Sequence, residues 1–118
     1  MEDSILVIKS KAFAIRTINL YKYLCSDKKE YVLSKQLLRS GTSIGANVRE
    51  AAFAQSKNDF ISKMSIALKE ASETHYWLEL LNETGYLTDV EGDSLKKDCK
   101  EILKILQASV ITAKANKS

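Results

Sequence analysis

Proline is absent from all 118 residues of the chain, and only four glycines occur. Proline breaks helices and glycine weakens them, so a chain almost free of both can stay helical nearly throughout. No stretch alternates apolar and polar residues between turn dipeptides, as β-strands do. The sequence therefore predicts an all-α fold, and its length suits one domain, residues 1–118, with a single core.

Apolar residues recur at helical spacing in four segments. The expected helices cover about residues 4–24, 32–54, 56–84 and 88 onward. Ser56 with Asp59 and Thr88 with Glu91 have the spacing of helix-capping boxes, and Gly85 suits the position just beyond a helix end. Short connections between helices of similar length place successive helices antiparallel. We expect an up-down-up-down four-helix bundle.

The first expected helix is apolar on more than one side. One stripe consists of Leu6, Phe13, Leu20 and Leu24, and a second consists of Ile5, Ile8, Ala12 and Ile15. Coverage this wide suggests that the helix makes contacts on more than one side.

Two other helices carry an extra stripe away from their core face. The stripes are Arg39, Ser43, Asn47 and Glu50 on the second helix, and Lys63, Ile66, Glu70, Glu73, Trp77 and Leu80 on the third. A single bundle does not readily bury both faces of a helix, and large apolar side chains beside charges that can pair are typical of subunit interfaces. We predict that these stripes form an oligomer interface; the alternative is a pair of exposed helix faces.

Gly41 and Gly45 lie inside the second expected helix. Each costs about 1 kcal/mol relative to alanine, a cost that close packing of another backbone can recover. Close helix packing is therefore expected, and a tolerated flexible site is the alternative.

Residues that could carry catalysis or bind metal are few. The single histidine, His75, follows Ser72 by three residues, whereas a metal site in a bundle needs glutamate there. His75 is expected at the edge of the core, and a catalytic base acting with Glu73 is the alternative. Cys25 and Cys99 have neither zinc-ligand spacing nor a nucleophile motif. We therefore predict a protein that is not an enzyme, with no metal, no cofactor and no small-molecule substrate.

A row of lysines on the fourth expected helix is the most suggestive functional surface. It consists of Lys96, Lys97, Lys100, Lys104 and Lys114. Such a row can contact phosphates, although a solvated helix face is the alternative. Asp98 and Glu101 lie beside it and weaken its positive potential. The net charge of +3 permits nucleic-acid binding without requiring it.

No targeting or membrane segment stands out in the sequence. No apolar run approaches the roughly 18 residues that span a bilayer, and residues 1–8 begin acidic, unlike a secretory signal. Two cysteines without a disulfide framework fit a reducing compartment. We expect a cytoplasmic protein that does not contact membranes.

The segment from Ser34 to Leu81 resembles a known family. The matching residues are QLLRSGTSIGANVREA at 36–51 and the run at 56–81, which includes DFISKMSIALKEASETHYWLELL at 59–81. They are similar to the four-helix-bundle proteins encoded by intervening sequences within bacterial 23S ribosomal RNA genes, often labelled S23-type ribosomal proteins. One departure is Ala51, where many relatives carry glycine.

The resemblance implies a four-helix bundle that assembles as a homopentamer. A related branch, the accessory variability determinant of diversity-generating retroelements, is a basic pentamer that works with a reverse transcriptase and RNA. The family motif falls partly on the two stripes and assigns no catalytic role to them. The sequence hypothesis is therefore a non-enzymatic homo-oligomer that binds RNA or a nucleoprotein partner. The alternative is a protein-interaction scaffold without nucleic-acid contact.

Overall fold

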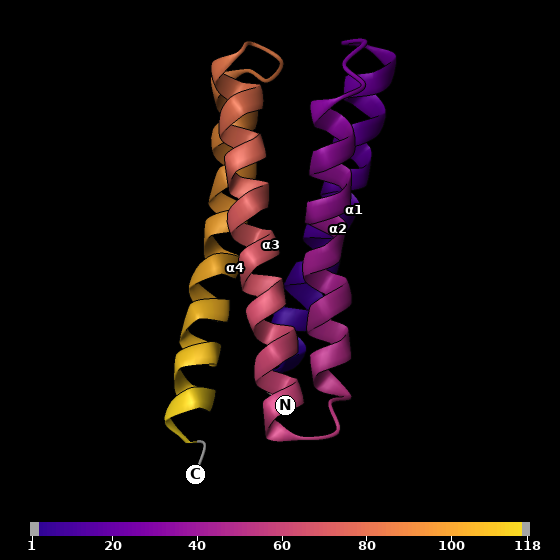
Figure 1. Ribbon diagram of the computed structural model, residues 1–118. Helices are drawn as coiled ribbons and strands as arrows, with labels where there is room; N and C mark the ends of the chain where they lie inside the picture. Colours follow the sequence, from indigo (N-terminus) through magenta and orange to yellow (C-terminus); the bar gives the residue numbers. More distant parts are fainter. Residues whose placement is uncertain (1–2, 117–118) are drawn as a thin grey trace.

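The four expected helices are all present in the computed structural model, which describes residues 3–116, with side chains from residue 5 onward. They are α1 (Asp3–Ser26), α2 (Leu33–Ala52), α3 (Lys57–Glu83) and α4 (Asp89–Ala115). The helices run alternately up and down along a rod of 50 × 21 × 20 Å (Figure 1). Within the described residues there is no strand. The prediction of an antiparallel, all-α bundle is confirmed, with helix ends shifted by one or two residues.

The core runs along the rod axis and receives side chains from every helix. On α1 the stripe of Leu6, Phe13, Leu20 and Leu24 is buried, whereas the stripe that contains Ile5, Ile8 and Ile15 stays outside the core. Ile5, Ile8 and Ile15 are 56%, 66% and 52% exposed. The second apolar stripe of α1 is therefore not covered by other described residues of the chain. An apolar strip of this kind is unusual on a surface that meets only water.

Glu30 fixes the start of α2 in a way that the sequence pattern did not reveal. Its carboxylate accepts hydrogen bonds from the backbone N–H groups of Leu33 at 2.9 Å and Ser34 at 2.7 Å. Burial raises the pKa of Glu30, but these backbone donors outweigh burial and hold it below its ordinary value. The carboxylate thus replaces the side-chain cap that Val32, the residue at the helix boundary, does not provide.

The other helix boundaries follow the predicted signals, with one difference. Thr88 and Glu91 form the complete capping box of α4, and Gly85 adopts a positive φ of 86° after α3. At α3 only half of the expected box forms, because the Asp59 carboxylate accepts from the N–H of Gln55 at 3.3 Å. The side chain of aspartate is one methylene shorter than that of glutamate, the residue typical of this position.

Gly41 and Gly45 allow α1 and α2 to pack closely. A Cβ atom at Gly41 would lie 2.6 Å from Cγ2 of the buried Thr17, and one at Gly45 would lie 3.3 Å from the carbonyl oxygen of Ser10. Both distances are too short for an unperturbed contact. Close helix packing, rather than a flexible site, therefore explains the two interior glycines.

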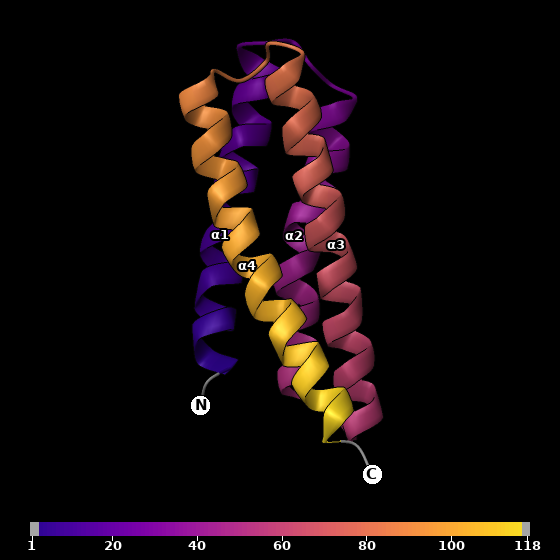
Figure 2. The same ribbon diagram turned by 90° about the vertical axis from the view of Figure 1, so that its left-hand side faces the viewer.

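The edge between α1 and α4 is the least closed part of the bundle. The two helices contact each other much less than the sequential pairs do, and they diverge toward the N-terminal end of α1 (Figure 2). Two ion pairs bridge the edge, Arg16 with Asp98 at 2.6 Å and Lys9 with Glu101 at 3.0 Å. A hollow of about 200 Å³ lies along it.

Candidate nucleic-acid interface

A groove of about 620 Å³ runs between α3 and α4 and contains most of the predicted lysine row. Its floor and walls are polar or charged side chains only. They are His75 and Glu79 from α3, and Asp93, Lys96, Lys97, Lys100, Glu101 and Lys104 from α4. The α4 residues recur every three or four positions, which places them on the side of the helix away from its core residues. The groove therefore combines one strongly basic wall with a smaller wall from α3.

The lysines of this wall differ in how far their charge is compensated. Lys96 approaches Asp93 at 3.8 Å, a loose pair on consecutive turns. Among the residues that the structure describes, Lys97, Lys100 and Lys104 have no carboxylate within 4.0 Å. These three ammonium groups are thus available to an anion in the groove.

The two acidic residues that seemed to oppose the lysine row are engaged elsewhere. Asp98 pairs with Arg16 of α1, whose guanidinium also donates to Ser94 Oγ at 3.2 Å. Glu101, although it lines one rim of the groove, pairs with Lys9. Basic residues of α1 therefore offset the acids on α4, although in the sequence these acids are neighbours of the lysines.

Lys114 lies in the last turn of α4 and does not line the groove. A cation there is well placed to interact with the negative end of the helix dipole. The structure therefore brings four of the five predicted phosphate-contacting lysines together and leaves the fifth apart.

His75 and Glu79 form the α3 wall of the groove. His75 Nδ1 lies 3.6 Å from Glu79 Oε1, beyond hydrogen-bonding distance, and their side chains are 19% and 45% exposed. Glu73 points elsewhere, because its carboxylate contacts Arg39 and accepts from Trp77 Nε1 at 2.9 Å. The structure therefore does not join His75 and Glu73 in the pair that the catalytic alternative requires, since Glu73 contacts Arg39 of α2 and His75 lines the groove with α4.

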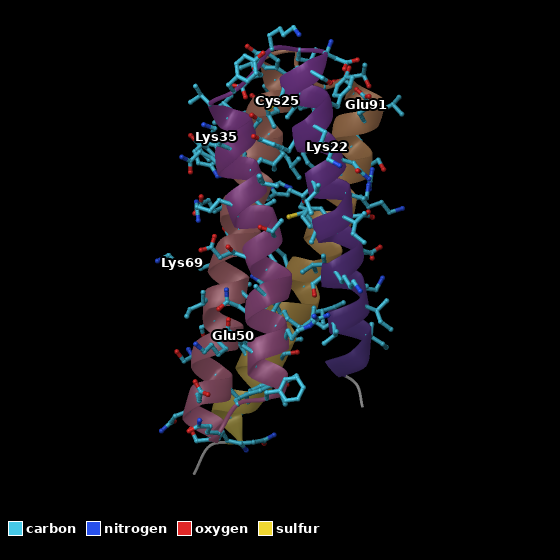
Figure 3. All side chains as sticks on the ribbon, turned by 90° about the vertical axis from the view of Figure 1, so that its right-hand side faces the viewer. Lys22, Cys25, Lys35, Glu50, Lys69 and Glu91 are labelled. Atoms are coloured by element: carbon cyan, nitrogen blue, oxygen red, sulfur yellow. The ribbon has the colours of Figure 1, made fainter. Side chains whose placement is uncertain are left out.

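The two stripes predicted as an oligomer interface lie next to each other between α2 and α3. Arg39 contacts Glu70 at 3.2 Å and also Glu73, and Lys63 contacts Glu50 at 3.1 Å; Glu50 is seen low on α2 in Figure 3. The charges at both ends of the stripes are therefore paired within one chain, and they do not need a second subunit for that purpose.

The uncharged members of the stripes lie around these ion pairs. Ser43 Oγ donates to the carbonyl of Arg39 at 2.7 Å, and Asn47 Nδ2 donates to that of Ser43 at 2.9 Å. Ile66 is 40% exposed, whereas Trp77 and Leu80 are partly buried. The apolar surface left for a partner subunit thus centres on Ile66, and its role as an interface stays a prediction.

The two thiols have different surroundings. Cys99 is buried, donates to the Ala71 carbonyl at 3.3 Å and has its pKa raised by burial to about 12. Cys25 lies at the end of α1, with Sγ 3.8 Å from Ser34 Oγ. Residues 3–116 contain no group of three or more potential metal ligands, and none of the helices formed there is long and apolar enough to cross a membrane.

These features define an antiparallel helical bundle with one basic groove and no assembled catalytic group among the described residues. The chain belongs to the 23S rRNA-intervening sequence protein family, whose model matches residues 2–108. It is also similar to the crystal structure of a protein of unknown function from the S23 ribosomal protein family of Bacteroides thetaiotaomicron. That chain is 55% identical, with a TM-score of 0.91, and the match covers 93% of this chain and 98% of the other. The comparison with curated proteins gives no match.

Proposed function

We propose that the chain is a non-enzymatic RNA-binding protein whose α3–α4 groove holds the phosphate backbone. The observation that carries this proposal is the set of three lysines, Lys97, Lys100 and Lys104, that share one groove without a carboxylate partner among the described residues. Binding releases counterions from RNA, so each lysine that neutralises a phosphate contributes to affinity and to its salt dependence.

The experiment compares two triple variants with equal loss of charge. Lys97, Lys100 and Lys104 are changed to glutamine in one, and Lys22, Lys35 and Lys69 in the other. The control lysines are exposed, lie on α1, α2 and α3 and are labelled in Figure 3. Filter binding to a structured RNA is then measured across a series of salt concentrations.

The groove variant is expected to lose affinity and to reduce the slope of log K against log salt by about 3, one unit for each phosphate contact. The control variant should change the slope by less than 1. Binding that is absent at low salt, insensitive to salt, or weakened equally in both variants would contradict the groove as the RNA site.

We also propose that the chain is a homo-oligomer, with a pentamer as the expected form. The support is the surface around Ile66 between the paired stripes, together with the apolar strip on α1. Light scattering should give a mass several times the 13.2 kDa of one chain. Ile66→Lys should dissociate the assembly, whereas Ile111→Lys, at a residue 68% exposed on α4, should leave it intact.

Ile66 is a sharper probe of this interface than Trp77. The Trp77 indole donates to Glu73, so a charged substitution there would disturb the chain itself as well as any partner contact. A monomer at micromolar concentration would overturn the oligomer proposal. Dissociation by Ile8→Lys but not by Ile66→Lys would move the interface to α1.

A further inference from the structure

The two walls of the α3–α4 groove differ in charge. The α4 wall presents four ammonium groups, which can only donate hydrogen bonds, and two carboxylates, Asp93 and Glu101, which lie within 4.0 Å of Lys96 and Lys9. The α3 wall presents the Glu79 carboxylate, which can only accept hydrogen bonds when ionised. Within the described residues, Glu79 makes no hydrogen bond, and its carboxylate Oε1 lies 3.6 Å from His75 Nδ1. The Glu79 carboxylate is thus a hydrogen-bond acceptor that lies in the same groove as the lysines and has no donor among the described residues.

A carboxylate in a groove for phosphates is unfavourable unless something in the ligand compensates for it. At a separation of a few ångströms near a protein surface, two like charges repel by several kcal/mol at most. The ribose 2′-hydroxyl is a hydrogen-bond donor that accompanies every phosphate of RNA and is missing from DNA. A hydroxyl that donates to Glu79 would satisfy the carboxylate while the lysines hold the adjacent phosphate.

We propose that Glu79 makes the α3–α4 groove selective for ribose over deoxyribose by accepting a hydrogen bond from a 2′-hydroxyl. This inference rests on the proposed RNA-binding function and specifies the ligand of the same groove. His75 Nδ1 lies 3.6 Å from Glu79 Oε1 on the same wall of the groove. The lysines supply affinity for any polyanion, and Glu79 supplies the preference for RNA.

The test uses three single-stranded oligonucleotides of one sequence: RNA, 2′-O-methyl RNA and DNA. The methylated strand keeps an oxygen at the 2′ position but has no hydroxyl to donate. Affinities are measured by fluorescence anisotropy for the unchanged protein, for Glu79→Ala and for Glu83→Ala. Glu83 is exposed near the end of α3 and does not line the groove, so its variant removes the same charge outside the site.

The unchanged protein and Glu83→Ala should both prefer RNA over DNA by roughly 10-fold, the value of one hydrogen bond to a charged group. The 2′-O-methyl strand should bind as weakly as DNA. In Glu79→Ala the preference should fall below about 2-fold, because the acceptor is gone. DNA binding by this variant should be unchanged or slightly stronger, since a repulsive charge has been removed.

A protein that binds RNA and DNA equally well would overturn the inference and leave RNA binding itself intact. So would a Glu79→Ala variant that binds both strands more tightly with the same preference, because Glu79 would then act only by repulsion. If none of the three strands and no structured RNA binds, the proposed function fails as well, and the two failures are thereby distinguished.

Discussion

Helix α1 is held by two neighbours in very different ways. Against α2 it packs so closely that Thr17 and Ser10 occupy the space of missing side chains at Gly41 and Gly45. Against α4 it makes few contacts, and the edge is bridged by two ion pairs whose side chains are 39–49% exposed. Exposed ion pairs contribute little stability. The contact with α2 therefore contributes more than the contact with α4 to holding α1 in the bundle.

The difference between the two contacts bears on function as well as on stability. The ion pairs at the open edge use the carboxylates of Asp98 and Glu101. On the opposite edge of α4, Lys97, Lys100 and Lys104 then have no carboxylate partner among the described residues, and they line the groove. The α1–α4 edge therefore affects the distribution of charge along α4 more than it affects the stability of the bundle.

The largest expected effect comes from breaking the tight contact of α1 with α2. Gly41→Ala should lower the free energy of unfolding by about 1.5 kcal/mol, because overpacking against Thr17 exceeds the gain of roughly 1 kcal/mol in helix propensity. Urea denaturation followed by circular dichroism measures the change.

A double variant identifies the cause of that loss. Thr17→Ala removes both side-chain atoms nearest to the new methyl group, so Gly41→Ala should destabilise a Thr17→Ala background much less than it destabilises the original chain. Equal destabilisation in both backgrounds would show that the clash is not with Thr17, and a stabilised Gly41→Ala single variant would refute close packing altogether.

A smaller effect is expected at the cap that begins α2. Glu30→Gln should cost about 1 kcal/mol near neutral pH, because a neutral amide accepts weaker hydrogen bonds than a carboxylate. The lowered pKa of Glu30 means that its charge stabilises the fold above the ordinary pKa of the group. This contribution is lost as pH falls through the folded-state pKa.

Urea denaturation at several pH values therefore tests the cap directly. The gap between the unchanged protein and Glu30→Gln should narrow as pH falls from the ordinary pKa of glutamate, and it should close below the lowered folded-state pKa of Glu30. Glu83→Gln, at an exposed residue that caps nothing, is the control and should show no such gap. A gap that stays constant with pH would mean that the charge of Glu30 is not what the cap uses.

Helical periodicity was sufficient to predict the elements and the core. Leu37, Ile44 and Val48 are buried as their spacing indicated, and glycines inside α2 correctly indicated close packing. The cap by Glu30 could not be predicted, because the carboxylate reaches forward to Leu33 and Ser34 from a loop whose course depends on where α1 ends. Features that depend on residue spacing within one helix could be predicted from the sequence. Features that depend on how the chain turns between helices could not.

The site was predictable in part for the same reason. The lysine row was visible because it lies on one helix, but its second wall comes from α3, and spacing alone does not give the rotation of α3 against α4. The paired stripes illustrate the converse. Each was recognised, yet which helix faces Arg39 depended on packing, and its partners Glu70 and Glu73 lie more than thirty residues away in sequence.

The smallest effect is expected at the open edge of α1 and α4. Arg16→Met should reduce the free energy of unfolding by about 0.5 kcal/mol at low salt, because it removes one exposed ion pair, and by less at high salt, where such pairs are screened. Lys11→Met, an exposed lysine of α1 without an ion-pair partner among the described residues, is the matched control. If Arg16→Met costs as much as Gly41→Ala, the ion pairs hold α1 as firmly as its contact with α2. Asp98, released from Arg16, should also lower RNA affinity slightly by restoring an uncompensated negative charge beside the lysines, an effect that the control variant lacks.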